Sequence, residues 1–250
     1  MQKYNNNKLF YKQNGFCVVR SFLKPAQLKK IDEKVKKFIL EKSNKLKGKN
    51  INFTKNNVPN TIHDIDKFEK FFQKFAKNKK NIKIAKFFLD SEPEFRKCEI
   101  FAKPAKVGLA SPMHQDNFLF AVKNNNALTF WISLDKSNKK NGGLSYIAGS
   151  HKLGILKHEN SFMPGTSQKI SKDVLKDKCH KLKRITPVLN PGDMLIHHCM
   201  IAHGSNVNKS ARSRRGLTIQ YKDKKSSYDL KRKKHYEKNL TKQLKARNQL

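Results

Sequence analysis

Apolar residues in the first third of the chain repeat mainly at helical spacing. A short strand is predicted over residues 15–20, and Pro25 suits the first position of the helix that follows it. The apolar positions of this helix recur every three or four residues, with Lys and Glu between them, at Leu28, Ile31, Val35, Phe38 and Ile39. The pattern predicts an amphipathic helix of roughly four turns that ends before Gly48.

The next segments predict a loop and then two packing helices. Residues 43–62 are polar and rich in Asn and Lys, which indicates a loop. Several phenylalanines share one face of a helix predicted over residues 66–78, and the apolar residues of a second helix over 79–90 can pack beside them. We expect these side chains to belong to the core.

From about residue 95 the pattern changes to short β-prone runs separated by turn residues. The runs cover residues 96–102, 114–122, 127–134, 143–148, 183–189, 193–198 and 216–221. Turn signals such as Asn141-Gly142-Gly143 and Asn190-Pro191-Gly192-Asp193 lie between them. Strands at this spacing are typical of a sandwich or a jelly roll. The polar segment 152–181 predicts a long loop that contacts substrate.

A chain of 250 residues can bury a full core, so we predict one domain with terminal additions. The N-terminal strand and helices are placed at 14–92, the β core at 95–222 and a basic tail at 223–250. Three leucines of the tail form a weak helical stripe, which favours a solvated terminal helix over a binding arm.

Composition restricts the cellular setting. No apolar run approaches the roughly 20 residues of a membrane span, and the polar N-terminus, Met1 to Lys8, does not resemble a secretory signal. The four cysteines are widely spaced and form no CxxC pair, which argues against a disulfide framework and a zinc site. We therefore expect a reducing, cytoplasmic location.

The net charge of +36 has two interpretations. It could be the footprint of a protein that binds nucleic acid or another polyanion. However, Lys supplies nearly all of the charge and Asn is abundant, whereas proteins that read a nucleic acid groove rely on Arg. A compositional origin is therefore favoured, and a positive surface would still suit an anionic substrate.

The candidate chemistry centres on His114-Gln115-Asp116 and on His203 far downstream. Side chains two apart on a strand point to the same face, so His114 and Asp116 would both face the interior. With His203 they form the two-histidine, one-carboxylate triad of non-haem Fe(II) oxygenases, whose open positions can accept a chelating 2-oxo acid and dioxygen. The competing His235-Tyr236-Glu237 has no histidine downstream.

Three arginines follow His203. A guanidinium at the start of a strand can hold a carboxylate by two parallel hydrogen bonds, which the distal carboxylate of 2-oxoglutarate requires. Arg212 and Arg214 share strand parity and Arg215 opposes them, so spacing alone does not decide which arginine points inward.

The order of these motifs along the chain is as distinctive as the motifs themselves. It runs Gly15 to Arg20, Lys103-Pro104, His114-Gln115-Asp116, Trp131, Asn141-Gly142-Gly143, Gly149-Ser150-His151, Gly192-Asp193, His203-Gly204-Ser205 and Arg214. Over residues 14–222 it resembles the phytanoyl-CoA dioxygenase family of Fe(II)/2-oxoglutarate-dependent oxygenases. The resemblance implies a mainly β fold, with a double-stranded β-helix (jelly-roll, cupin-like) core and N-terminal and flanking helices.

The resemblance also implies roles for individual residues. His114, Asp116 and His203 would bind iron, and Arg214 would pair with the far carboxylate of 2-oxoglutarate with help from Ser205.

Gln115 and Trp131 would contribute to the co-substrate pocket, although strand alternation turns Gln115 away from its neighbours. His151 is expected in a structural turn, and His197 and His198 are expected to be structural or pocket-lining.

The implied reaction is the oxidative decarboxylation of 2-oxoglutarate to succinate and CO2, which consumes O2 and hydroxylates a C–H bond of a small or medium organic substrate. Asp116 favours hydroxylation, because related halogenases lack this carboxylate. Two alternatives stay open: a nucleic-acid or polyanion-binding protein, and a non-catalytic family member. The sequence fixes neither the substrate nor the oligomeric state.

Overall fold

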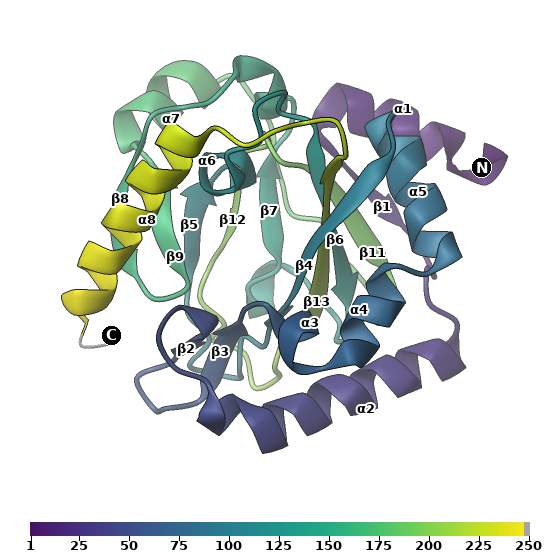
Figure 1. The fold of residues 1–250 in the computed structure, drawn as a ribbon, viewed down its shortest axis with the longest axis vertical. Coiled ribbons are helices and arrows are strands. Elements are labelled where there is room, and N and C mark those ends of the chain that lie inside the picture. Colours follow the sequence, from purple (N-terminus) through teal and green to yellow (C-terminus); the bar gives the residue numbers. More distant parts are fainter. Residues whose placement is uncertain (248–250) are drawn as a thin grey trace.

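Two antiparallel sheets face each other in the computed structural model, which describes residues 1–247 (Figure 1). The larger sheet has the order β1 (Phe16–Val19), β11 (Met194–His198), β6 (Ala127–Ser133), β13 (Gly216–Asp223), β4 (Pro93–Phe101), β3 (Pro59–Ile62) and β2 (Ile51–Phe53). The smaller sheet has the order β10 (Arg184–Ile185), β7 (Leu144–Ile147), β12 (His203–Ser205) and β5 (Ser111–His114). A hairpin of β8 (His158–Met163) and β9 (Thr166–Ile170) packs beside β5. This arrangement confirms the predicted jelly roll.

Helices surround the two sheets. The α-helices are α1 (Asn5–Asn14), α2 (Pro25–Lys42), α3 (Ile65–Phe68), α4 (Lys70–Ala76), α5 (Lys79–Leu89), α6 (Asp116–Phe120), α7 (Lys172–Cys179) and α8 (Leu230–Lys245). Short 3-10 helices cover Gln2–Tyr4, Ser43–Lys45, Gly48–Asn50, Lys139–Asn141 and Ser150–Leu153. Among the described residues, no helix combines the length and the apolar character that crossing a membrane requires.

The larger sheet separates the main core from the space between the sheets. Apolar side chains of its strands, such as Ile100, Phe130 and Ile219, are buried in one cluster with helix residues that include Ile31 and Phe72. Because side chains alternate along a strand, their neighbours point to the opposite face. Those neighbours are largely polar, so the sheet turns its polar face toward the smaller sheet, where the candidate site lies.

The helix predictions hold with one break. The helix predicted from Pro25 is confirmed by α2, and the helix predicted over 79–90 by α5. The helix predicted over 66–78 is divided into α3 and α4 because Glu69 has an extended backbone between them. The Glu69 side chain caps the second helix by accepting a hydrogen bond from Phe71 N.

The predicted loop over 43–62 and the predicted strand over 114–122 are partly wrong. Residues 43–62 contain β2 and β3, which pair so that Ile51 and Ile62 lie directly opposite each other and are buried. The strand ends at His114, and α6 follows. The Asn117 side chain donates to Val122 O and accepts from Val122 N, and these two hydrogen bonds stabilise the end of this short helix.

The expected loop over 152–181 and the expected solvated tail also need correction. Residues 152–181 contain the β8–β9 hairpin and α7, and the tail forms α8, which runs along the hairpin (Figure 1, yellow). The fully buried Gln243 accepts a hydrogen bond from Phe162 N, and Ser167 donates to Tyr236 Oη. The tail is therefore a helix, as predicted, but one of its faces is packed.

Candidate active site

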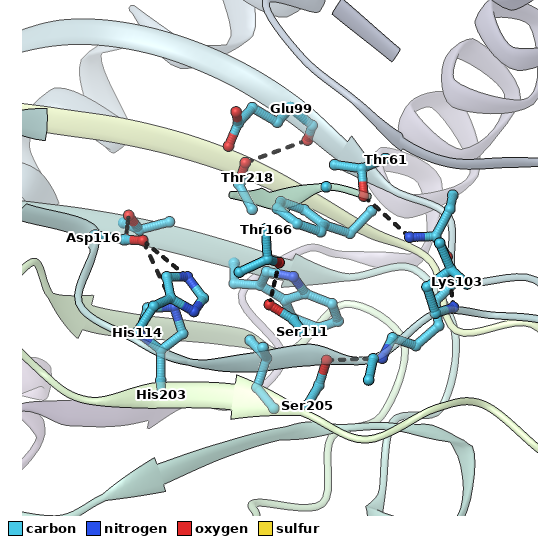
Figure 2. Close-up of a pocket in the computed structure, with 18 of the residues that line it drawn as sticks. Thr61, Glu99, Lys103, Ser111, His114, Asp116, Thr166, His203, Ser205 and Thr218 are labelled. Carbon is cyan, nitrogen blue, oxygen red and sulfur yellow. Dashed lines mark hydrogen bonds and ion pairs between the residues drawn. The ribbon is translucent and has the colours of Figure 1, made fainter. Parts of the chain in front are cut away.

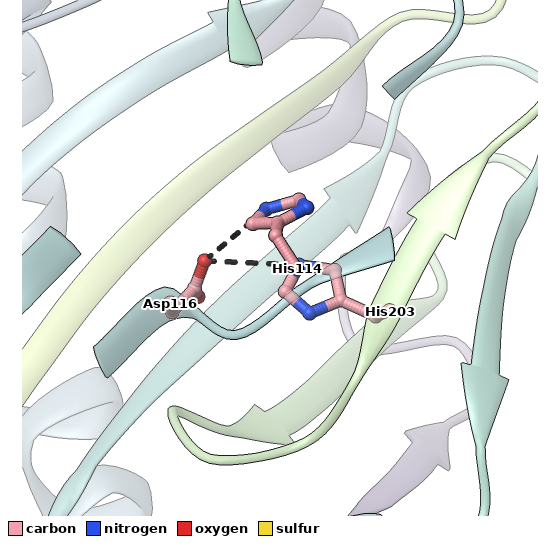
Figure 3. Close-up of side chains that lie close together, drawn as sticks. All are labelled: His114, Asp116 and His203. Carbon is pink, nitrogen blue, oxygen red and sulfur yellow. Dashed lines mark ion pairs between the residues drawn. The ribbon is translucent and has the colours of Figure 1, made fainter. Parts of the chain in front are cut away.

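Two histidines and an aspartate converge between the sheets (Figure 3). His114 on β5 and His203 on β12 are directly opposite each other in the smaller sheet, and Asp116 is the first residue of α6. The Asp116 Oδ1 atom lies 3.8 Å from His114 Nε2 and 3.7 Å from His203 Nε2. One ligand atom from each residue lies within 4.8 Å of the others, so one metal ion could contact all three.

Backbone carbonyls fix how the two imidazoles are presented. The Nδ1 atom of His114 lies 2.8 Å from Pro112 O, and that of His203 lies 3.1 Å from Ile201 O. Each Nδ1 therefore carries the proton and donates it, which leaves the Nε2 lone pair directed at the site. Burial and the nearby His114 lower the pKa of His203 to about 3, so its ring is neutral near pH 7.

Asp116 supplies the negative charge of the site. Burial alone would raise its pKa, but the adjacent His203 and a hydrogen bond from His197 lower the pKa well below its ordinary value. The carboxylate is therefore ionised. Two imidazoles and one carboxylate are the donor set of the facial triad, so these residues fit an iron ion.

A buried arginine lies at the other end of the same pocket. Arg214 is 1% exposed, and its Nε and Nη2 atoms donate to Gly142 O at 3.1 and 2.7 Å. Its guanidinium also lies over the Trp131 ring, 5.1 Å from the centroid. The Nη1 atom is buried and has no hydrogen-bond partner among the described residues, so one donor is available to a bound group.

Lys103 adds a second buried basic group. Its Nζ atom donates to Ser205 Oγ at 2.8 Å and to Asn206 O. Burial and the neighbouring Arg214 lower the pKa of Lys103 to about 6. Within residues 1–247 neither group forms an ion pair with a carboxylate. This end of the pocket is therefore suited to an anion.

The structure separates the three arginines that spacing left equivalent. Arg214 lines the pocket, whereas Arg212 is exposed. Arg215 pairs with Asp135 and with Asp32 of α2, at 2.6 and 2.7 Å, and so ties the helix to the sheet.

Ser205 and Trp131 line the pocket as expected, but Gln115 does not. The fully buried Gln115 amide donates to Gly154 O and Met200 O at 2.9 and 2.7 Å, and it accepts a hydrogen bond from Leu156 N at 2.8 Å. Its amide is therefore occupied within the fold, where it joins two loops to the segment between the candidate ligands. Strand alternation indicated its direction correctly.

The remaining histidines differ in position. His197 lines the pocket beside Asp116, whereas His198 lies near Tyr11 of α1 and near His151, away from the site. His151 lies in the 3-10 helix after Gly149 and is 3.2 Å from Lys12 O, which agrees with its expected structural role.

Polar side chains form the walls between the triad and the surface (Figure 2). Glu99 accepts hydrogen bonds from His63 and Lys97, at 2.6 and 2.7 Å, and from Gln220 at 2.8 Å. Although burial would raise its pKa, Lys97 and His63 lower it to about 2, so the carboxylate is ionised.

The β8–β9 hairpin forms the roof of the pocket. Thr166 and Ser111 share a hydrogen bond of 2.9 Å, and Gly165 lies against Thr61 across the pocket. A second cavity shares Glu99, His114 and Asp116 with this pocket, and Tyr236 and Leu240 of α8 line it. The segment in which substrate contacts were expected therefore contributes its hairpin turn.

Sequence reasoning assigned no role to Lys103, Glu99 or Thr129. The Lys103-Pro104 pair was visible as a motif, but one lysine among 55 basic residues carries little signal. Glu99 and Thr129 read as ordinary residues of amphipathic strands, and only the packing of the two sheets brings them to the pocket.

Comparison with known proteins places the chain among oxygenases. A family model described as "Phytanoyl-CoA dioxygenase (PhyH)" matches residues 11–216. A probable alpha-ketoglutarate-dependent hypophosphite dioxygenase of Stutzerimonas stutzeri is 27% identical over 220 residues, which cover 84% of this chain and 76% of that protein. The peroxisomal phytanoyl-CoA dioxygenase of Bos taurus is 23% identical over 233 residues, which cover 88% of this chain and 68% of that protein.

Two solved structures show the same fold. EctD from S. alaskensis with bound Fe has a TM-score of 0.74 at 18% identity, and the match covers 88% of this chain and 76% of that one. The epimerase SnoN in complex with Fe3+, alpha ketoglutarate and nogalamycin RO has a TM-score of 0.75 at 17% identity and covers 91% of this chain and 86% of that one.

Proposed function

Because the chain belongs to the phytanoyl-CoA dioxygenase family of iron- and 2-oxoglutarate-dependent enzymes, we propose that it hydroxylates a C–H bond of a small or medium anionic substrate. Succinate and CO2 would be released. Iron(II), 2-oxoglutarate and O2 are its cofactor and co-substrates, and bound iron supplies the redox chemistry that couples decarboxylation to C–H oxidation. The observation that carries the proposal is the convergence of His114, Asp116 and His203 with both imidazole tautomers fixed.

These three residues would hold the iron. The Nε2 atoms of His114 and His203 and Oδ1 of Asp116 are the candidate ligands, since the other nitrogen of each ring already donates to a backbone carbonyl. Three protein ligands on one side leave further coordination positions for co-substrates.

Arg214 and Lys103 would hold the far carboxylate of 2-oxoglutarate. Arg214 offers the unpartnered Nη1, and Lys103 offers a positive charge when protonated. Ser205 positions the lysine through its hydrogen bond, and the Trp131 ring covers the guanidinium. Charge-assisted hydrogen bonds are roughly twice as strong as neutral ones, so an anion would strongly favour this end of the pocket.

The remaining walls support a substrate with both polar and apolar parts. Polar groups such as Thr61, Ser111 and Thr166 alternate there with apolar side chains such as Phe101 and Leu109. A purely hydrocarbon chain would leave the polar groups without hydrogen bonds. The name of the hypophosphite dioxygenase relative indicates a small anion, and a net charge of +36 would attract one.

The test is conversion of 2-oxoglutarate to succinate by purified protein with Fe(II), ascorbate and O2. We expect turnover to rise with members of a panel of small carboxylates, organic phosphates and alkylphosphonates more than with matched neutral compounds. If no member of a broad panel ever stimulates the consumption of 2-oxoglutarate, the proposal fails.

Polyanion binding, the alternative raised by the charge, rests on composition and is not proposed. Steeply salt-dependent binding of nucleic acid would revive it. The four cysteines are all buried and free, which supports the proposal that the protein is located in the reducing cytoplasm.

The affinity for 2-oxoglutarate is expected to fall as the pH rises above about 6, because the pKa of Lys103 in the empty pocket is about 6. A bound carboxylate raises that pKa, so binding takes up a proton in the interval between the two values. The dissociation constant then grows by up to about tenfold per pH unit. Anaerobic titrations of the iron-loaded protein at pH 6, 7 and 8 measure this slope. Lys103→Met removes the charge and should flatten it; equal slopes in both proteins would exclude Lys103 as the anion's partner.

A further inference from the structure

The second oxygen of Asp116 is held by two donors from neighbouring strands. Asp116 Oδ2 accepts a hydrogen bond from Thr129 Oγ1 at 2.9 Å, and it lies 3.1 Å from His197 Nε2. His197 on β11 and Thr129 on β6 are directly opposite each other in the larger sheet. All three side chains are buried. Two side chains of the larger sheet therefore hydrogen-bond to Oδ2 of Asp116, while Oδ1 faces the histidines of the smaller sheet.

A buried tyrosine holds the other nitrogen of His197. Tyr146 Oη lies 3.0 Å from His197 Nδ1. A carboxylate oxygen accepts, so His197 donates from Nε2 to Asp116, and the Tyr146 hydroxyl occupies Nδ1. Tyr146 is itself held in place by stacking on Phe16, with ring centroids 4.5 Å apart. The result is an ordered chain from Tyr146 through His197 to Asp116.

This arrangement leaves His197 no part as a metal ligand. A ligating imidazole must present a lone pair, whereas both nitrogens of His197 are occupied. His197 therefore acts through Asp116 and is a positioning residue.

We propose that His197 and Thr129 hold Asp116 as a one-oxygen ligand and so keep a coordination position open for co-substrate. The inference rests on the proposed function. A free carboxylate can bind a metal through one oxygen or two, and the second mode would occupy a position that a chelating 2-oxo acid needs. Chelation by Asp116 would compete with both hydrogen bonds to Oδ2, so the loss of either donor would favour it.

The test measures binding in the absence of O2, with Co(II) as a spectroscopic substitute for Fe(II). Wild type is compared with His197→Phe, which keeps a planar ring but removes the donor, and with Thr129→Val, which keeps the shape but removes the hydroxyl. We expect each change to weaken 2-oxoglutarate binding to the metal-loaded protein by about 10–100-fold, a range taken from the loss of metal affinity or activity when a partner of a metal ligand is removed. The visible spectrum of the Co(II) protein should shift toward a higher coordination number before 2-oxoglutarate is added.

Three further variants separate positioning from loss of structure. His197→Gln retains an N–H donor and should recover most of the affinity for 2-oxoglutarate. Tyr146→Phe retains the stacked ring, removes only the hydroxyl, and should weaken binding less than His197→Phe. The matched control is His198→Gln, because His198 lies on the other side of the strand, near Tyr11 and His151. This variant should have the wild-type Co(II) spectrum and the wild-type affinities for metal and for 2-oxoglutarate.

Two results would overturn the inference. One is a His197→Phe protein, or a Tyr146→Phe protein if the first does not fold, that has the wild-type Co(II) spectrum and wild-type affinity for 2-oxoglutarate. The other is a His197→Gln protein that is as impaired as His197→Phe. If wild type itself binds neither metal nor 2-oxoglutarate, the proposed function fails instead, so the two failures are distinguishable.

Discussion

His203→Ala is expected to remove tight iron binding and to lower 2-oxoglutarate turnover by about a thousandfold or more. Loss of a partner that only supports a metal ligand already costs about 10–100-fold in affinity or activity, and loss of a ligand itself leaves a site with two donors. The ring of His203 is buried and its Nε2 atom is directed at the site. Anaerobic Fe(II) titration followed by a succinate assay measures both effects.

The chain supplies a matched control for this variant. His235 belongs to a second His-x-acid pattern, on α8, and is exposed. His235→Ala should therefore bind iron and turn over 2-oxoglutarate as wild type does. If His203→Ala retained wild-type iron affinity and turnover, the assignment of the metal ligands would be wrong.

Arg214→Met is expected to raise the KM for 2-oxoglutarate by about 100- to 1000-fold, with little effect on iron binding. Removing one partner of a buried charge pair costs about 3–5 kcal/mol, because the other charge is left uncompensated. In this protein the uncompensated charge would be the co-substrate carboxylate, with Lys103 as its remaining partner. Methionine keeps most of the side-chain volume, so the Trp131 ring retains a neighbour.

The adjacent arginines provide the comparison. Arg212→Met changes an exposed residue and should leave both KM and stability unchanged. Arg215→Met breaks the pairs with Asp135 and Asp32, so it should lower the thermal midpoint without a specific effect on KM. An Arg212→Met protein with the larger rise in KM would show that the wrong guanidinium has been assigned.

The order of the motifs was enough to predict the jelly roll and the three residues that converge. Strand alternation predicted that His114 and Asp116 face the same way, as they do. The predicted strand was nevertheless too long, since it ends at His114 and Asp116 starts α6. Gln115 between them keeps an extended backbone, so the alternation of side chains continues through it.

Other parts of the site depend on contacts between distant segments. Spacing could not choose among the three arginines, because the choice is made by the Gly142 carbonyl, 72 residues away from Arg214 in the chain. Likewise, Lys103 acquires its lowered pKa only when folding buries it beside Arg214. Such properties arise from packing and charge proximity, which a local pattern does not encode.

Helix α8 lies outside the part of the chain that contains the candidate chemistry. The family model ends at residue 216, whereas the helix that lines the cavity beside the candidate site spans Leu230–Lys245. The residues proposed to handle iron and 2-oxoglutarate all lie within the matched part. Substitutions at Tyr236 and Leu240 of α8 are therefore expected to change which molecules reach the site while leaving the candidate iron and 2-oxoglutarate residues unaltered.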